Sequence, residues 1–349
     1  MSVVDIRPPD GEHATESASN PLLILCYSGP SMCPGADDES LDIVLPLLQK
    51  VAAKDKNGKS CVGKCGTGGS GHYVKMIHNG IEHGMMSAIA EAWSIMVTGL
   101  GMSYDEIAQV FEQWDNEGEL RGTFLVNIGI RINKAEDPKT GERVLSTVED
   151  KVVQDITGEE GTGIWSNMQA VETHIPAPTM TTAHYFRLAS ADRRQRRRAQ
   201  ETFGGDFPPQ KLDVKDKPAF LEDLRQAVYS SCLAAYVQGI NVITKKNREE
   251  HWNINFAEVW QIWRAGCIIQ ADGISELLKP IFADRTKYND MNLLYEESIG
   301  KELRKTKPAL QRVIGAAVQH DHVVPAMSAT LEYLKYQTSL GESFRTAYV

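Results

Sequence analysis

The sequence predicts a mainly helical protein with a short α/β segment at its front. Beyond residue 70, apolar residues recur at helical spacing, and no segment alternates as a half-buried strand would. The apolar run typical of a buried strand, LLILCYS at residues 22–28, lies before that point. No internal repeat of about 20–50 residues is present, so we do not expect a solenoid or a propeller.

The bulk composition indicates a globular chain. Of its 349 residues, 42% are hydrophobic and 24% are charged, and the net charge of −9 argues against nucleic acid as the main partner. No apolar run approaches the roughly 20 residues of a membrane span, and the N-terminus lacks the basic start and apolar stretch of a signal peptide. Six cysteines are too sparse for a disulfide scaffold. We therefore expect a reduced, cytoplasmic protein without a structural metal.

The front of the chain differs from the rest. Residues 1–20 are polar and proline-rich, which predicts disorder. Residues 21–65 hold the predicted strand, a turn and the amphipathic helix LDIVLPLLQKVAAK, which Pro46 should break. Residues 66–349 form the predicted helical domain.

The helical domain opens with a long helix from His72 to Leu100, which is apolar almost all round beyond Met85. Ser103 and Glu106 form a capping box that starts the next helix. Further helical patterns cover residues 120–132, 146–156, 164–175, 178–200, 218–246, 256–282 and 325–340.

Three short motifs are better explained by structure than by function. GTGGSG at 66–71 matches G-x-G-x-x-G, but no second strand follows it, so a flexible hinge is favoured over a pyrophosphate cradle. RRQRRR at 193–198 is a nuclear signal, a phosphate patch or a solvated helix end, and the acidic chain favours the last. Cys61 and Cys65 lack the C-x-x-C spacing of a redox pair.

One motif is a candidate for a catalytic site. Lys75, His78, Asn79 and Glu82 follow one another at i, i+3, i+4 and i+7, which places them on one face of the long helix. They are either a solvated face with a Lys–Glu pair or a site. For a site, a Lys deprotonated by burial and a Glu with a raised pKa would give a base and an acid. The imidazole and the amide would hold a polyhydroxylated substrate.

The segment GGSGHYVKMIHNGIEHG closely resembles the K-M-x-H-N-G-I-E helix of decarboxylating 6-phosphogluconate dehydrogenases. Six other segments fall in the family's order between residues 27 and 340: YSGPSMCPGA, WDNEGEL, GTGIW, FLEDLRQAVY, WRAGCII and PAMSATLEYLKY. The resemblance implies an all-helical substrate and dimerisation domain, preceded at 21–65 by the remnant of a Rossmann NADP domain.

The resemblance also implies an activity and site residues. The family oxidises 6-phosphogluconate with NADP and releases carbon dioxide to give ribulose 5-phosphate, in the pentose phosphate pathway. Lys75 matches the family's base and Glu82 its acid. Substrate contacts are implied for four further residues, namely His78, Asn79, Thr162 and Arg187, the last two near the 6-phosphate. A small sugar acid and a homodimer are the implied partners.

The chain departs from the family at four places. No complete Rossmann domain precedes Tyr27, and the chain stops at Val349, where the family's tail would supply residues to the other subunit. His83 and Glu160 stand where the family has a Tyr and a Lys that contact the phosphate. The alternatives are therefore a non-catalytic, dimeric sugar-acid-binding paralogue and a truncated form of an enzyme for a different sugar acid.

Three expectations follow from these departures. The chain should not bind NADP tightly. The apolar segments 220–240 and 259–269 should form a homodimer interface, because they carry too much apolar area for an exposed surface. Glu160 should disfavour 6-phosphogluconate, since it exchanges a cation for an anion beside the phosphate.

Overall fold

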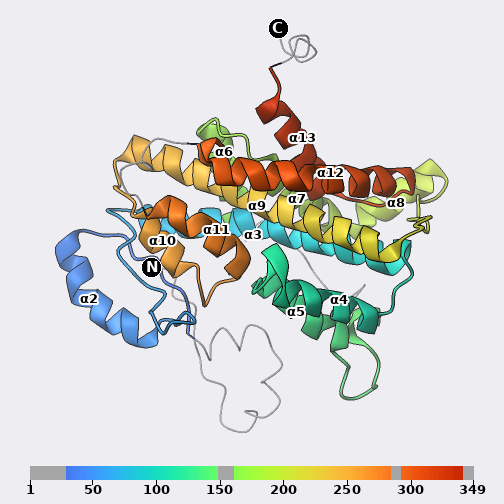
Figure 1. The fold of residues 1–349 in the computed structure, drawn as a ribbon, viewed down its shortest axis with the longest axis horizontal. Coiled ribbons are helices and arrows are strands. Elements are labelled where there is room, and N and C mark those ends of the chain that lie inside the picture. Colours follow the sequence, from blue (N-terminus) through green and yellow to red (C-terminus); the bar gives the residue numbers. More distant parts are fainter. Residues whose placement is uncertain (1–28, 148–160, 284–291, 341–349) are drawn as a thin grey trace.

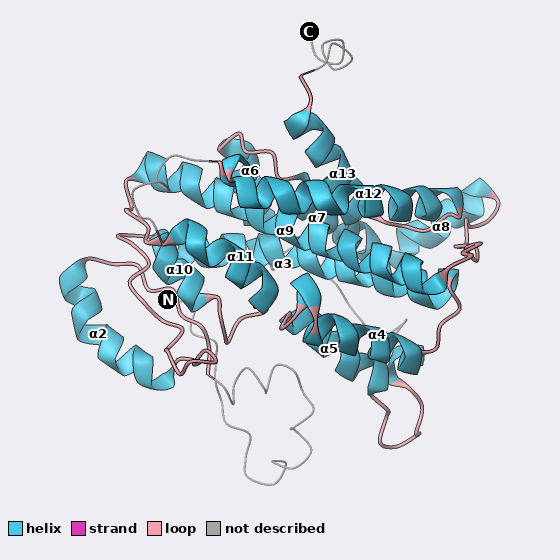
Figure 2. Cartoon of the chain, viewed as in Figure 1, coloured by secondary structure: helices cyan, strands magenta, loops and turns pink. Residues whose placement is uncertain are grey.

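The computed structural model describes residues 29–147, 161–283 and 292–340. Within these ranges the protein is helical and contains no β-strand (Figures 1 and 2). Isolated bridges occur, and two of them, Met32 with Val62 and Gly35 with Gly66, are parallel. The strand predicted at 22–28 and the disorder predicted for 1–20 lie outside the described residues.

The helical architecture is built around long helices that cross the whole molecule. Figure 1 shows α3, α9 and α12 running across it, with α10 and α11 at one end and α4 and α5 below the other. The α-helices are α2 (Asp38–Val51), α3 (Ser70–Ser94), α4 (Tyr104–Asn116), α5 (Phe124–Lys134), α6 (Thr162–Glu172), α7 (Pro178–Ala191), α8 (Arg193–Phe203), α9 (Lys217–Glu250), α10 (Phe256–Ile262), α11 (Asp272–Phe282), α12 (Glu297–Gln319) and α13 (Pro325–Thr338). The shorter helical turns are η2 (Ile95–Gly99), η3 (Gly118–Leu120), η4 (Val144–Ser146) and η5 (Leu293–Tyr295).

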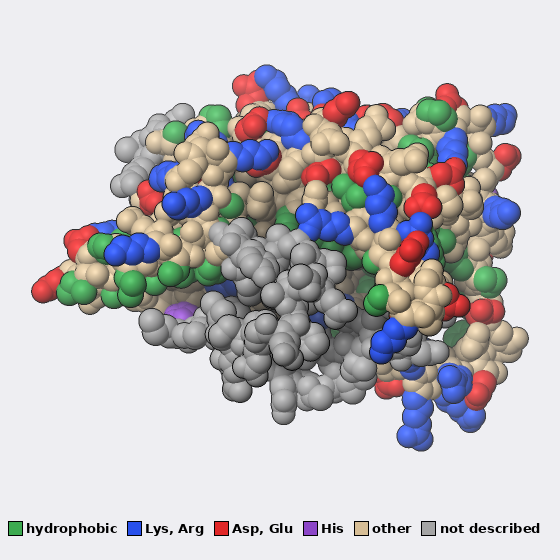
Figure 3. Space-filling model, turned by 90° about the horizontal axis from the view of Figure 1, so that it is seen from below, with side chains coloured by type: hydrophobic (Ala, Val, Ile, Leu, Met, Phe, Trp, Pro, Cys, Tyr) green, Lys and Arg blue, Asp and Glu red, His purple; other side chains and the backbone are tan. Residues whose placement is uncertain are grey.

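The first described helix, α2, corrects one prediction, because Pro46 does not break it. The proline is exposed, so the carbonyl that loses its hydrogen bond can be solvated. The apolar face of α2 is exposed as well, with Ile43 at 74% and Leu47 at 64% of their full accessible area. Figure 3 shows hydrophobic side chains along this arm, at the left of the view.

The long helix predicted from His72 to Leu100 is confirmed. Helix α3 covers Ser70–Ser94 and continues without a break as the π-helix η2, Ile95–Gly99. The predicted capping box is also present, since the Ser103 side chain accepts from the Glu106 amide and Glu106 caps Ser103 in return.

Three other helix predictions need correction. The pattern at 178–200 divides into α7 and α8 at Asp192, whose side chain caps α8. The pattern at 256–282 divides into α10 and α11, which are joined by a loop. Helix α12 was not predicted, because Pro308 interrupts its pattern, yet this proline too is exposed and lies inside the helix. The helix predicted at 146–156 lies almost entirely outside the described residues.

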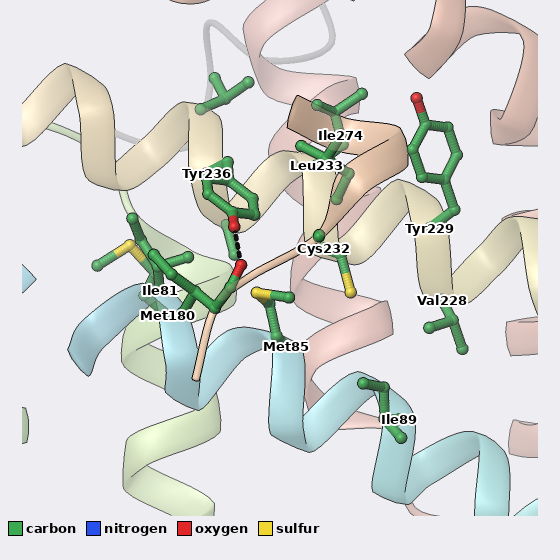
Figure 4. Close-up of a cluster of buried hydrophobic side chains, with 14 of the residues drawn as sticks. Ile81, Met85, Ile89, Met180, Val228, Tyr229, Cys232, Leu233, Tyr236 and Ile274 are labelled. Carbon is green, nitrogen blue, oxygen red and sulfur yellow. Dashed lines mark hydrogen bonds between the residues drawn. The ribbon is translucent and has the colours of Figure 1, made fainter. Parts of the chain in front are cut away.

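The core forms where α3 and α9 pack side by side. Ile81, Met85 and Ile89 of α3 meet Val228, Cys232 and Tyr236 of α9 (Figure 4). Tyr236 donates its hydroxyl to the carbonyl of Ile269, which ties the loop before α11 to this core. Because α9 is buried almost continuously from Ala227 to Thr244, its apolar area is used inside the protomer. The reason given above for a dimer interface at 220–240 is therefore wrong.

Glycines allow other helices to approach α3 closely. A Cβ atom on Gly80 would lie 2.5 Å from Met180 of α7 and 2.8 Å from Ser166 of α6. A Cβ on Gly84 would lie 2.9 Å from Ala235 of α9. Glycine at these positions therefore gives α3 the short separation from α6 and α7 that a larger residue would prevent.

The glycine-rich loop before α3 is closely packed and does not resemble an open cradle. A Cβ on Gly71 would lie only 1.8 Å from the carbonyl oxygen of Cys33. Thr67 donates its amide to the carbonyl of Trp252, and Gly68 has a φ of +55°. The chain at 33–35 thus covers the start of α3, and the glycines serve this close contact.

The predicted basic segment forms α8, in which every residue is exposed or nearly so, as the solvated-helix interpretation requires. No helix in the described ranges combines the length and apolar character needed to cross a membrane.

Candidate functional site

The four residues of the predicted stripe meet on the first half of α3. Lys75 donates from Nζ to Asn79 Oδ1 at 3.1 Å, and the same Nζ lies 3.3 Å from His78 Nδ1. His78 Nδ1 is also 3.1 Å from Asn79 Oδ1 and 3.9 Å from Glu82 Oε2. The i, i+3, i+4 and i+7 spacing therefore produces a connected polar cluster, as the sequence predicted.

His78 is the buried centre of this cluster. Its side chain is 1% exposed and packs edge-on against Trp263, with the ring centroids 6.1 Å apart. Burial lowers the pKa of His78 well below its usual value, and the nearby Lys75 charge lowers it further. His78 is therefore a neutral imidazole. Its Nε2 is buried and has no hydrogen-bond partner among the described residues.

Glu82 has the character of an acid. Its side chain is 15% exposed, and burial raises the pKa of its carboxyl. The charges of Lys75 and Arg187 oppose this shift without reversing it. The influence of Arg187 shows that α7 brings its guanidinium near the carboxyl, 105 positions along the chain from Glu82. A carboxyl with a raised pKa is able to carry and deliver a proton at a higher pH than usual.

Lys75 differs from the expectation. The sequence predicted that it would be buried, but its side chain is exposed at the edge of the cluster. The reason is the face of α3 on which it lies, because its neighbours Val74 and Ile77 are buried in the core while Lys75 points away from it. The amine therefore faces the open side of the site.

Thr162 joins the cluster from another helix. It is the first residue of α6, and its hydroxyl accepts a hydrogen bond of 3.0 Å from Asn79 Nδ2. Asn79 thus bridges Lys75 on its own helix and Thr162 across the interface. The N-terminus of α6 has no side-chain cap and no acidic residue in its first turn, which leaves partial positive charge at this end of the site.

His83 follows Glu82 on α3. The structure adds a neighbour of His83 that the sequence prediction missed. The His83 ring stacks on the ring of His184 from α7, with centroids 5.0 Å apart and planes inclined by 2°. Asn167 of α6 lies behind this pair, 2.8 Å from His184 Nδ1. The available signal was spacing, because His184 precedes Arg187 by three residues on the same helix. Glu160 lies outside the described residues.

The thiols near the cluster do not offer a nucleophile. Cys65 and Cys267 are buried, and burial raises the pKa of each to about 12. A nucleophilic cysteine needs the opposite shift. The chemistry of the cluster is therefore that of an amine, a neutral imidazole, an amide and a carboxyl.

Known proteins share this arrangement of sequence and fold. The family model described as 6-phosphogluconate dehydrogenase, C-terminal domain, matches residues 71–343. The decarboxylating 6-phosphogluconate dehydrogenase of Emericella nidulans is 45% identical over 332 residues, which are 91% of this chain and 66% of that protein. The decarboxylating 1 form from Oryza sativa subsp. japonica is 37% identical over 312 residues, which are 88% of this chain and 61% of that protein.

A solved structure of the same family is similar to this chain in fold. The Plasmodium falciparum 6-phosphogluconate dehydrogenase, described in its apo form and in complexes with its cofactor NADP+ and its substrate 6-phosphogluconate, matches with a TM-score of 0.78 at 30% identity. The match covers 90% of this chain and 64% of that one. The chain thus spans about two thirds of the length of these proteins. Because the family model covers most of the helical domain, stripe included, the chain belongs to the 6-phosphogluconate dehydrogenase family through its C-terminal domain.

Proposed function

We propose that the cluster on α3 is the sugar-acid site of a 6-phosphogluconate dehydrogenase-like oxidoreductase. The observation that carries this proposal is the connected set Lys75–Asn79–Thr162 beside a buried Glu82 whose pKa is raised. An amine, an amide and a hydroxyl present donors and acceptors to a polyhydroxylated chain. Family membership makes 6-phosphogluconate the first ligand to test.

The residues take different roles in this proposal. Lys75, which faces the open side, takes the proton from the C3 hydroxyl during oxidation and returns one to the carbonyl oxygen. Glu82 delivers a proton to C1 after carbon dioxide has left, because its raised pKa favours the protonated carboxyl. His78, Asn79 and Thr162 orient the hydroxyl groups. Arg187 faces the phosphorylated end, where its planar fork suits a phosphate.

The described residues are not assigned to the cofactor. The family uses NADP, but the glycine loop at 66–71 is not preceded by a strand in the described residues, and its Gly71 is in close contact with the carbonyl oxygen of Cys33. We therefore assign the described residues to the sugar acid and not to the cofactor. The described part of residues 21–65 contains α2 and isolated bridges and no Rossmann unit, so the assignment of this segment as the remainder of an NADP domain stays a proposal. The homodimer stays part of the proposal.

Calorimetry with the 349-residue chain tests the proposal. We expect binding of 6-phosphogluconate or gluconate, and we expect Lys75→Met and Asn79→Ala each to weaken it at least tenfold. Lys301→Met is the matched control, because it removes an exposed lysine that pairs only with Glu297. If both α3 variants bind as the unmodified chain does, the cluster is not the sugar-acid site. Binding without turnover in the presence of NADP is expected both of a non-catalytic paralogue and of a truncated enzyme, so this test concerns the sugar-acid site alone.

A further inference from the structure

The stacked pair His83–His184 is held from three helices. His184 is 2% exposed, and its ring lies flat against that of His83, with the planes inclined by 2°. Gly163 of α6 touches both rings, because a Cβ at this position would lie 2.5 Å from His83 Cε1 and 2.8 Å from His184 Nε2. The two rings therefore fill a slot whose walls are α3, α6 and α7.

The hydrogen bond to Asn167 gives the two rings unequal roles. Asn167 Nδ2 donates to His184 Nδ1 at 2.8 Å, so this nitrogen accepts and the neutral ring carries its hydrogen on Nε2. His184 is therefore the ring whose orientation is fixed by the bond to Asn167, and His83 is the ring that stacks on it.

The ionisable groups near the pair come from two helices. Glu82 of α3 precedes His83, and Arg187 of α7 lies near that carboxyl. Tyr185, also on α7, is the other titratable neighbour, with its ring 6.5 Å from that of His184. The described residues of α6 beside the pair are uncharged. Helix α13 packs on α7 through Thr330, which bonds Thr179, and its Glu332 pairs with Lys335.

We propose that His184 is a positioning residue, which holds His83 where it meets the phosphorylated end of the sugar acid. This inference rests on the proposed function, because it needs the sugar acid to lie along the α3 cluster. Gly163 follows Thr162, which is bonded to Asn79, so the slot lies at the end of that cluster. The first-turn amides of α6 and the Arg187 guanidinium complete an arrangement that suits an anion.

Two substitutions of His184 separate stacking from packing. His184→Ala removes the ring, while His184→Phe keeps a flat ring against His83. By calorimetry on the 349-residue chain, we expect the Ala variant to bind 6-phosphogluconate about tenfold more weakly, a loss of about 1.4 kcal/mol. Its affinity for gluconate should change less than twofold, and the Phe variant should stay within about threefold for both ligands.

The control removes another buried histidine. His322, which is 5% exposed and bonds the carbonyl of Gln210, is remote in sequence from the cluster and packs against Gly99. His322→Ala should lower the melting temperature without changing the ratio of the two affinities. An equal loss for phosphorylated and unphosphorylated ligands in His184→Ala, or a Phe variant as weak as the Ala variant, would overturn the positioning role.

A measurement without substrate keeps the two proposals distinguishable. In the nuclear magnetic resonance spectrum, the His83 ring protons, assigned with His83→Gln, should be displaced upfield by the His184 ring and should return in His184→Ala. Inorganic phosphate should shift these signals in the unmodified chain and not in that variant. If no sugar acid binds but phosphate still acts on His83 in this way, the proposed function fails, and with it the contact to a sugar acid, while the placement of His83 toward a phosphate group by His184 is retained. Identical His83 signals in both proteins reject the positioning role.

Discussion

At Gly80, helix propensity and the packing between helices favour different residues. Glycine in a helix interior costs about 1 kcal/mol relative to alanine, so Gly80→Ala should stabilise an isolated α3. In the protein the new methyl would lie 2.5 Å from Met180 and 2.8 Å from Ser166. Forcing the helices apart typically costs about 1–3 kcal/mol. We predict a net loss of free energy of unfolding, measured by urea denaturation.

The control for Gly80 lies on α12. Gly315 has open space around its Cα, so Gly315→Ala gains the propensity term without a clash. We expect it to raise the free energy of unfolding by about 0.5–1 kcal/mol. A Gly80→Ala variant that is stabilised by a similar amount would show that α6 and α7 can move away from α3 at little cost.

The candidate site could be predicted where its residues share one helix. The spacing of Lys75, His78, Asn79 and Glu82 is enough to place them together, because helix geometry is local. The partners from other helices depend on tertiary packing, so Thr162 and Arg187 came from the family resemblance and His184 was missed. The burial of Lys75 was predicted wrongly because which face of α3 is covered depends on the packing of other helices. The effect assigned to Glu160 stays a prediction.

Among the elements, α13 depends on a carboxylate from α3. Glu91 is buried, burial raises the pKa of its carboxyl, and it accepts hydrogen bonds from the amides of Ala326 at 2.8 Å and Met327 at 3.0 Å. These amides belong to the first turn of α13, where no intrahelical acceptor exists. We predict that Glu91→Ala lowers the free energy of unfolding by about 2–3 kcal/mol.

Hydrogen exchange can localise this effect. The amides of α13 should lose protection in Glu91→Ala before those of α9 do, because only α13 loses its cap. Glu297→Ala is the comparison, since this residue is in the first turn of α12 but its side chain is 82% exposed. Its effect should be much smaller than that of Glu91→Ala, because water screens an exposed carboxylate. Uniform loss of protection across the protein would contradict a local capping role for Glu91.

Glu119 connects three elements and predicts an acid-sensitive step. Located on η3, it accepts from Arg225 of α9 and from Lys305 of α12. Burial alone would raise its pKa, but these hydrogen bonds outweigh burial and lower the pKa to about 2. Because the folded pKa is lowered, the stabilisation is complete above about pH 4.5 and is lost as the pH falls toward 2.

The expected size of this step is roughly 1–2 kcal/mol, because Lys305 is partly exposed and solvent screens its charge. Free energies of unfolding measured between pH 5 and pH 2 should therefore fall more steeply in the unmodified chain than in Glu119→Gln. Parallel pH profiles for the two proteins would show that the contacts of Glu119 with Arg225 and Lys305 make no pH-dependent contribution to the free energy of unfolding.

The helices could be predicted where apolar periodicity is uninterrupted, as in α3, α4 and α9. The errors at α2 and α12 share one physical cause, which is proline on a solvent-facing side. Pro46 and Pro308 are both exposed inside helices, where water can solvate the carbonyl that proline leaves unbonded. A sequence pattern shows the proline but not which side of the helix faces water. The division of 178–200 follows from Asp192, whose capping role becomes visible only with the backbone geometry.

At the scale of the whole molecule, α2 and α6 each carry four exposed large hydrophobic side chains. The segments first expected at a dimer interface are buried in the protomer. On α6, by contrast, Trp165 is 54% and Val171 69% exposed, and α2 has the exposed face described above. Only α6 belongs to the helical domain that the family resemblance associates with dimerisation. Its exposed face, Trp165, Met168 and Val171, also adjoins the candidate site through Thr162.

We therefore predict a homodimer formed through the exposed face of α6. Light scattering at micromolar concentration should give about twice the 38.7 kDa mass of one chain. The double variant Trp165→Glu with Met168→Glu should be monomeric, because burying two carboxylates in an apolar contact costs several kcal/mol. Ile43→Glu with Leu47→Glu makes the same charge change on α2 and should leave the dimer intact. A monomeric unmodified chain would contradict the predicted dimer. If only the double variant of Ile43 and Leu47 dissociated, the interface would lie on α2 and not on α6.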